Sequence, residues 1–231
     1  MLPVYKSIGS TNDWKRVQGP SHNIVVNELA KKLQFSWSHT FNENDGLTYF
    51  AYTYPWSCAD SDKFIEKVFK DHAANPNLYL HKEELIRSPE GRKLEIITLT
   101  SAVGKTDQQE RNLPYLFAED NRPLKFENKK YIFVSCRVHP GEVPASFMLN
   151  GIFRYLLSNS KSDITENNID PRVSIILDNF VFVIIPILNP DGVYRGHYRM
   201  NTFGQNLNRY YGAPTLEKEP SNFAVNGLLE D

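Results

Sequence analysis

The sequence predicts an α/β protein in which a small, strand-rich N-terminal domain precedes a larger domain of mixed strands and helices. Aromatic and β-branched residues alternate with polar ones early in the chain, which is typical of short strands. Further on, an apolar strand, an amphipathic helix and a second apolar strand follow one another, and this order requires a parallel crossover. With 231 residues, 41% of them hydrophobic, the chain can bury a real core. We expect the first domain to span residues 1–58 and the second residues 59–231.

The N-terminal domain is expected to contain at least two strands. Residues 33–37 alternate in polarity, and residues 48–54 are nearly all aromatic or β-branched. Residues 42–46 between them have the composition of a turn. The Pro-Trp-Ser-Cys stretch at residues 55–58 then ends the strand-rich domain.

A helix and two strands are expected at the start of the second domain. Asp60 or Ser61 can cap a helix over residues 62–73, whose apolar residues recur at helical spacing. Residues 79–86 and 92–100 have the composition of strands, with a Ser-Pro-Glu-Gly turn between them. These elements predict an antiparallel hairpin that follows the first helix.

The centre of the second domain is predicted from the next five segments. Residues 104–130 are polar and lack periodicity, which indicates a long loop. Residues 131–135 form a strand, residues 145–157 an amphipathic helix, and residues 159–171 a polar connector. The uninterrupted apolar run at residues 180–187 indicates a strand that is buried on both faces. Ligand chemistry is expected at the carboxyl ends of such strands.

Composition excludes several classes of function. The 26 Lys and Arg residues balance 27 Asp and Glu residues, which argues against a nucleic-acid or anionic-membrane partner. The chain start lacks the apolar core of a signal peptide, and the longest apolar run, residues 180–188, is too short to span a bilayer. The two cysteines, Cys58 and Cys136, make no disulfide framework. We therefore expect a soluble protein in a reducing compartment.

A candidate metal site follows the strand at residues 131–135. His139 and Glu142 leave this strand together on a tight Pro-Gly loop. Such a pair can offer an imidazole nitrogen and a carboxylate to one Zn²⁺, with room for a third ligand and a water. The pattern His-x-x-Glu alone is not specific, because a loop histidine hydrogen-bonded to a nearby carboxylate has the same spacing.

Four motifs in a fixed order carry a family resemblance. They are His139-Pro-Gly-Glu142, the Leu-Asn-Pro-Asp-Gly stretch at 188–192, the Gly-His-Tyr-Arg stretch at 196–199, and Leu-Asn-Arg at 207–209. Together they resemble the cytosolic carboxypeptidase group of the zinc carboxypeptidases, the M14 family. The resemblance runs from about residue 50 to the end of the chain. It implies a small β domain followed by an incomplete zinc-carboxypeptidase α/β domain with a mixed sheet.

The resemblance also implies a role for each matching residue. His139 and Glu142 match the first two ligands of one Zn²⁺ ion. Arg199 matches the arginine that polarises the scissile carbonyl and stabilises the oxyanion. Asn208 and Arg209 match the pair that binds the C-terminal carboxylate of the substrate. The implied reaction is metal-assisted hydrolysis, in which zinc lowers the pKa of a bound water to about 7.

Substrate and location are implied by the resemblance alone. Proteins of the cytosolic group remove C-terminal or branched glutamates from protein tails, notably those of tubulin. A cytoplasmic protein is therefore expected, with microtubules and the nucleus as further places of action. Nucleic-acid and membrane partners are not expected.

Two departures from the family pattern are expected to affect activity. The family's third zinc ligand is a histidine well beyond the Asn-Arg pair, whereas this sequence has no histidine after His197. The family's general-base glutamate, which lies further on still, is expected to be missing too. We expect the 231 residues to be the first half to two-thirds of a catalytic domain, to bind zinc weakly and to be inactive alone.

The same residues allow other functions and other metal ligands. The chain could be a catalytically dead module that binds acidic tails through Arg199, Asn208 and Arg209. A zinc amidohydrolase of small acylated amino acids also uses His-x-x-Glu, but the upstream β domain and the Asn-Pro-Asp-Gly turn disfavour it. Spacing alone would allow His197 as a third ligand, although it lies inside the motif before Arg199. Cys136 lies next to the metal loop, which is the loop of residues 139–142 that carries both candidate ligands. We interpret Cys136 as a core thiol rather than a ligand or nucleophile.

Overall fold

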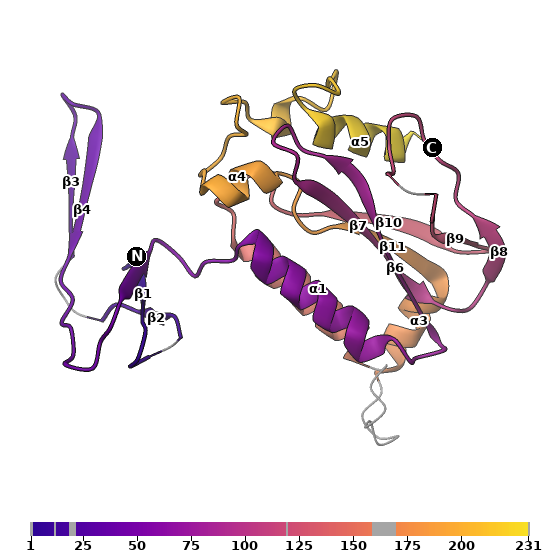
Figure 1. The fold of residues 1–231 in the computed structure, drawn as a ribbon, viewed down its shortest axis with the longest axis horizontal. Coiled ribbons are helices and arrows are strands. Elements are labelled where there is room, and N and C mark those ends of the chain that lie inside the picture. The colour runs from indigo at the N-terminus through magenta and orange to yellow at the C-terminus, as the bar shows by residue number, and fades with distance from the viewer. Residues whose placement is uncertain (1, 12, 19–21, 119, 159–169, 231) are drawn as a thin grey trace. The chain divides into compact units, whose positions relative to one another are not determined.

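The computed structural model describes most of the chain as two compact units. Described are residues 2–11, 13–18, 22–118, 120–158 and 170–230. The first unit is Met1–Pro55 and the second is Trp56–Asp231 (Figure 1). In the described ranges no helix combines the length and the apolar character needed to cross a membrane.

The N-terminal unit consists of two small antiparallel sheets. One has the order β2-β1-β5, formed by Lys15–Arg16, Val4–Ser7 and Thr48–Ala51, and the other is the hairpin of β3 (His22–Asn27) and β4 (Lys32–Trp37). Strands β4 and β5 lie where strands are predicted. An aromatic cluster surrounds His39, whose ring centroid lies 4.4 Å from that of Tyr5, 4.8 Å from Phe41 and 5.1 Å from Phe50.

A mixed four-stranded sheet of order β10-β11-β7-β6 forms the centre of the second unit. Strand β10 runs parallel to β11, and β11 and β6 both pair antiparallel with β7. The parallel pair confirms the predicted crossover, which contains helices α2 and α3. The mixed α/β architecture expected from the sequence is thereby confirmed. The bounds are β6 Leu78–Arg87, β7 Lys93–Ser101, β10 Lys130–Ser135, β11 Phe180–Ile185, α2 Pro144–Leu156 and α3 Pro171–Asn179.

Both faces of this sheet are covered. Ile97 and Ile184 pack on one face in a cluster that includes Phe153 of α2. Their chain neighbours Ile96 and Ile185 point to the other face, because successive strand residues alternate. There they pack in a cluster with residues of α5 (Pro220–Leu229), which lies across the sheet from α1 (Cys58–His72) in Figure 1. Strand β11 is therefore buried on both faces, as its apolar run predicts.

Helix α1 begins earlier than its predicted start at residue 62. Ser57 is the N-cap: its hydroxyl oxygen accepts from the backbone N–H of Asp60 at 3.2 Å, and the Asp60 carboxylate accepts from the backbone N–H of Ser57 at 2.8 Å. This reciprocal capping box satisfies two amide groups at once, which a cap at Asp60 or Ser61 would not. Ser61 is instead buried, and its hydroxyl accepts from the Trp56 indole N–H.

Two other predictions are wrong in part. The predicted loop at residues 104–130 contains β8 (Lys105–Gln109) and β9 (Leu124–Phe126), which pair antiparallel. Strand β8 contains only polar residues, and β9 is only three residues long, so neither shows a periodicity that would predict it. The predicted turn after β11 is the start of a short helix, α4 (Pro190–Arg195). Of the predicted connector at 159–171, residues 159–169 lie outside the described residues.

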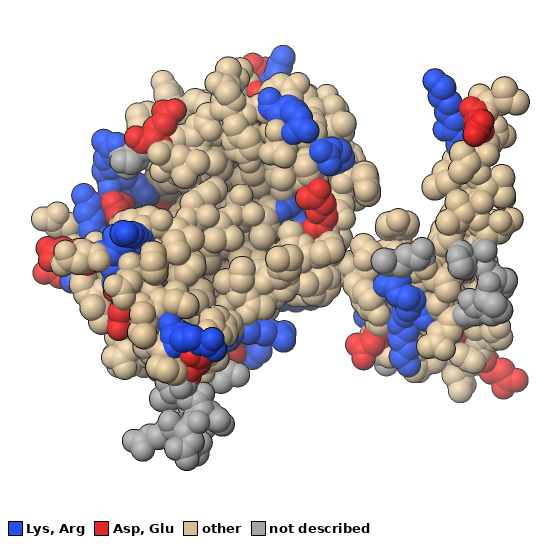
Figure 2. Space-filling view, turned by 180° about the vertical axis from the view of Figure 1, so that it is seen from behind, with Lys and Arg blue, Asp and Glu red and all other residues tan. Residues whose placement is uncertain are grey.

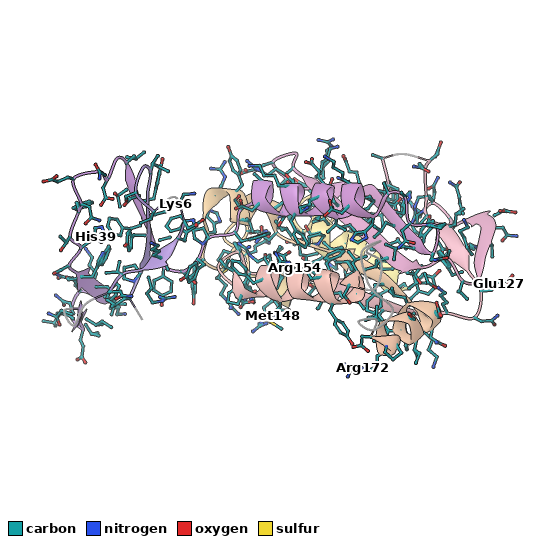
Figure 3. All side chains as sticks on the ribbon, turned by 90° about the horizontal axis from the view of Figure 1, so that it is seen from below. Lys6, His39, Glu127, Met148, Arg154 and Arg172 are labelled. Atoms are coloured by element: carbon teal, nitrogen blue, oxygen red, sulfur yellow. The ribbon has the colours of Figure 1, made fainter. Side chains whose placement is uncertain are left out.

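Core packing against the sheet gives a test of the fold. Phe153 on α2 is 1% exposed, so Phe153→Ala removes a large side chain from a closed core. We expect a loss of about 3–5 kcal/mol in the free energy of unfolding, measured by urea denaturation. Met148 on the same helix is 70% exposed and projects from α2 in Figure 3. Met148→Ala should change stability by less than about 0.5 kcal/mol, and equal losses in both variants would contradict the packing.

Candidate metal and substrate site

The candidate site is built where the parallel strands β10 and β11 end. Their pairing continues into the following loops: the backbone N–H of Cys136 donates to Ile185, and the carbonyl of Cys136 accepts from Leu188 at 2.8 Å. The Asn189 N–H then donates to the Arg137 carbonyl at 3.2 Å. These bonds bring the His139 loop beside α4, at the carboxyl ends of the strands, where ligand chemistry was expected.

Three of the predicted site residues lie together. The Nδ1 atom of His139 is 2.8 Å from Oε1 of Glu142. The Nη1 atom of Arg199 lies 3.5 Å from the same Nδ1 and 3.9 Å from the same Oε1. His139 is 5% exposed, whereas the Glu142 side chain is 59% exposed, so the group opens to solvent on the carboxylate side.

Asn206, for which the sequence motifs predicted no role, completes this group. Its Oδ1 atom lies 2.9 Å from Nε2 of His139 and accepts the backbone N–H of Asn208 at 3.1 Å. Since that backbone N–H can only donate, the Asn206 atom must be the amide oxygen, and Nε2 of His139 must carry a proton. Nδ1 faces the Glu142 carboxylate, to which it can donate a proton as an imidazolium or, in the neutral tautomer, present an electron pair that binds a cation. The only sequence signal for Asn206 is its place two residues before Asn208.

The arrangement of His139 and Glu142 fits a zinc ion. In a neutral imidazole with the proton on Nε2, the Nδ1 electron pair and the Glu142 carboxylate repel each other unless a cation lies between them. Zinc binds nitrogen and oxygen ligands at about 2.0–2.2 Å, so two atoms 2.8 Å apart can reach one ion. A histidine metal ligand commonly donates its other N–H to an oxygen, as His139 does to Asn206. Across the described parts of the chain, no set of three His, Cys, Asp or Glu residues is arranged to hold a metal ion.

The two predicted carboxylate-binding residues lie next to this group. Asn208 and Arg209 belong to a short 3₁₀ helix, Leu207–Arg209, that starts directly after Asn206. Both are exposed, and Nη1 of Arg209 donates to the Asn208 carbonyl at 2.9 Å. Within the described residues, no carboxylate forms a salt bridge with Arg209. Its guanidinium is therefore accessible to an anionic ligand.

Two glycines allow the motif loops to approach closely. A Cβ atom on Gly141 would lie 2.6 Å from the Tyr198 carbonyl oxygen, which accepts the Gly141 N–H at 2.8 Å. A Cβ atom on Gly192 would lie 2.4 Å from Cγ of Pro140. The glycines of the first two motifs therefore hold the metal loop against α4 and against the loop that carries Arg199.

The buried carboxylate of Asp191 anchors α4 to the turn between β6 and β7. Asp191 is 2% exposed and accepts hydrogen bonds from the Ser88 hydroxyl at 2.6 Å, the Arg92 guanidinium at 2.7 Å and the Glu90 backbone N–H at 3.1 Å. These three donors belong to the turn between β6 and β7. The Asn-Pro-Asp-Gly stretch is more than a turn, because Asp191 joins the motif to the sheet.

The two alternative ligand candidates, His197 and Cys136, both contact backbone carbonyl oxygens. Nδ1 of His197 lies 3.2 Å from the Met200 carbonyl oxygen within its own loop. The Cys136 thiol is 3.6 Å from the Ala145 carbonyl oxygen, and burial raises its pKa. A raised thiol pKa disfavours the thiolate that a nucleophile or ligand requires.

The chain is similar in sequence to a known family of metal-dependent peptidases. The sequence model of the family described as zinc carboxypeptidase matches residues 65–225. That range covers more than half of the chain. The chain belongs to the zinc carboxypeptidase family.

Particular relatives narrow the similarity further. The chain is 33% identical over 241 residues to mouse cytosolic carboxypeptidase-like protein 5, covering 99% of this chain and 26% of that protein. It is 31% identical over 191 residues to human cytosolic carboxypeptidase 1, covering 82% of this chain and 14% of that protein. The chain thus spans about a quarter or less of the curated relatives it matches. The structure of a putative carboxypeptidase A from Shewanella denitrificans shares the fold, with a TM-score of 0.68, 24% identity, and coverage of 99% of this chain and 47% of that one.

Paired glycine variants test the contact between α4 and the metal loop. Gly192→Ala should cost about 1–3 kcal/mol in the free energy of unfolding, since the new methyl group overlaps Pro140. Gly151 lies in α2, where an added methyl group would meet nothing within 4 Å. Gly151→Ala should therefore raise stability by about 0.5–1 kcal/mol. Chemical denaturation of both variants measures this difference, and equal effects would argue against the contact.

The hydrogen bond from His139 to Asn206 gives a second test. Asn206→Ala removes the acceptor that orients the imidazole, and we expect zinc affinity to fall by about 10–100-fold in a chelator-competition titration. Asn206→Asp keeps an acceptor oxygen and should retain most of the affinity. An Asn206→Ala variant that binds zinc as tightly as the wild type would exclude this orienting role.

Proposed function

We propose that the chain supplies the metal-binding and carboxylate-binding residues of a metallocarboxypeptidase that removes C-terminal residues from protein tails. One observation carries this proposal: His139, Glu142 and Arg199 converge within 3.9 Å on a single point at the carboxyl ends of β10 and β11. Family membership supports the reaction class. The exposed Arg209 beside this point supports selection of a chain end.

Each residue has a separate part in the proposed reaction. Nδ1 of His139 and the Glu142 carboxylate would hold Zn²⁺, which supplies a Lewis acid and an acidified water when bound. Asn206 keeps the imidazole in the tautomer that leaves Nδ1 unprotonated. The Arg199 guanidinium stabilises negative charge on the scissile carbonyl oxygen. Asn208 and Arg209 bind the terminal carboxylate and so position the last peptide bond.

Glutamate-rich tails such as those of polyglutamylated tubulin are the proposed substrates. Their dense negative charge suits a site with two arginines, Arg199 and Arg209. The names of the relatives support a cytosolic location, where tubulin tails are accessible. On the face shown in Figure 2, side chains of both charge signs are scattered without a continuous basic field. That distribution and the formal net charge of −1 do not favour a nucleic-acid partner.

A tail-binding function without hydrolysis is the second candidate. The small number of candidate metal ligands favours this function. Within the described residues, His139 and Glu142 come together without a third His, Cys, Asp or Glu side chain. Catalytic zinc sites usually have three protein ligands. We therefore propose that residues 1–231 alone bind acidic tails without cutting them, and that hydrolysis belongs to a longer polypeptide.

A peptide carrying a C-terminal glutamate tail tests both candidates. We expect the 231-residue chain to bind it and release no glutamate, and a longer polypeptide with the same site to release glutamate in a zinc-dependent manner. His139→Ala should abolish release by the longer polypeptide. Glutamate release by residues 1–231 alone would contradict the second proposal, and a longer polypeptide that never releases glutamate would contradict the first.

Binding of the same peptide tests the role of Arg209. Arg209→Ala should weaken binding about tenfold, which corresponds to about 1.4 kcal/mol, because it removes a charge-assisted contact to the terminal carboxylate. Arg154→Ala is the matched control, since this exposed arginine lies on α2 (Figure 3). Fluorescence anisotropy measures both. A peptide with an amidated C-terminus should bind the wild type and Arg209→Ala equally.

A further inference from the structure

Arg137 is a buried arginine to which neither the motifs nor the proposed reaction gives a role. It lies two residues before His139 and is 4% exposed. Its backbone φ is 57°, in the left-handed region that non-glycine residues rarely adopt. Burying a guanidinium and straining its backbone both cost free energy, so the surrounding structure must benefit from this residue.

The guanidinium of Arg137 contacts three separate segments. Its Nε and Nη2 atoms both donate to the Pro140 carbonyl, at 2.9 and 2.6 Å. Its Nη1 atom donates to the Ser146 hydroxyl at 2.9 Å and to the Trp56 carbonyl at 3.0 Å. Pro140 lies between the two candidate ligands, Ser146 lies in the first turn of α2, and Trp56 lies just before α1.

These contacts hold a loop that regular structure does not. Residues 139–142 contain no strand or helix hydrogen-bond ladder. Apart from the local turn bonds at Glu142, the backbone of this loop is held by the bond from Gly141 to Tyr198 and by the two bonds from Arg137 to Pro140. A planar guanidinium offers its donors in a rigid fork. The Arg137 side chain can therefore hold the Pro140 carbonyl while it also bonds to Ser146 in α2 and to Trp56 next to α1.

We propose that Arg137 is the positioning residue of the metal loop. Through the Pro140 carbonyl it sets the distance between His139 and Glu142. Its acceptors are two carbonyls and a hydroxyl, and none of the described carboxylates forms a salt bridge with it. Arg137 therefore holds the loop through the geometry of its N–H donors rather than through an ion pair. That the positioned residues are zinc ligands rests on the proposed function, whereas the positioning itself does not.

The competing explanation is that only the left-handed backbone matters. Asparagine adopts this conformation more readily than arginine, so Arg137→Asn keeps the turn and removes the guanidinium. Arg137→Lys keeps the positive charge and replaces the planar fork with a single ammonium group. Arg122→Asn is the matched control, because Arg122 is 7% exposed and bonds to Glu83 and Arg111, none of which belongs to the metal loop.

Amide hydrogen exchange on the metal-free chain tests the proposal. In Arg137→Asn and Arg137→Lys we expect exchange at the Gly141 amide to accelerate at least about tenfold more than at Leu99 in β7, as expected for local opening. Arg122→Asn should accelerate exchange without favouring Gly141. Equal acceleration at Gly141 and Leu99 in the Arg137 variants, or none at Gly141, would overturn the proposal. If the Arg137 variants do not fold, Ser146→Ala decides by the same criterion, because it removes one acceptor of the same fork.

Zinc affinity provides the second measurement. The Arg137 variants should lose about 10–100-fold, as is typical when the support of a metal ligand is removed, and Arg122→Asn should lose none. Selective exchange at Gly141 with no measurable zinc binding in any variant would refute the proposed metal site and leave the positioning role intact. Unchanged zinc affinity in folded Arg137 variants would contradict the positioning role.

Discussion

The backbone pairing that continues beyond the ends of β10 and β11 is the constraint on which the site depends. Cys136 and Arg137 pair with residues 188 and 189, so the loops after both strands begin side by side. The glycines at 141 and 192 then let these loops come closer than any side chain would permit. Residues far apart in the chain meet at one point for this reason.

The polar chemistry of the site follows from that closeness. The Asn206 amide oxygen accepts the backbone N–H of Asn208 and faces Nε2 of His139, which identifies Nε2 as the donor. In its neutral form the imidazole presents an electron pair to a carboxylate, and either a proton or a metal ion between the two satisfies this arrangement. Arg199 lies near enough to contribute positive charge in the absence of a metal ion. The proposed site thus brings two candidate metal ligands together with an arginine that can bind an anion.

Elements with a strong apolar periodicity could be predicted from the sequence. Features that depend on particular hydrogen bonds between side chains and backbone could not. The buried run at 180–187 and the helix at 145–157 were evident from apolar spacing. The start of α1 was not, because the choice between Ser57 and Asp60 as cap depends on a reciprocal pair of bonds. Strand β8 has no apolar residue and β9 has only three residues, so neither shows a periodicity that predicts a strand. His139, Glu142 and Arg199 could be proposed from motifs, but Asn206 and Arg137 act through contacts that only the folded chain displays.

An anomalous difference map at the zinc absorption edge, from crystals of this chain soaked in zinc, tests whether His139 and Glu142 bind one zinc ion. Soaking populates even a weak site, so the result does not depend on tight binding. We expect one peak about 2.0–2.2 Å from both Nδ1 of His139 and the Glu142 carboxylate, with Nε2 still bonded to Asn206. A peak at Nε2, or zinc bound elsewhere while the His139 loop stays empty, would contradict this expectation.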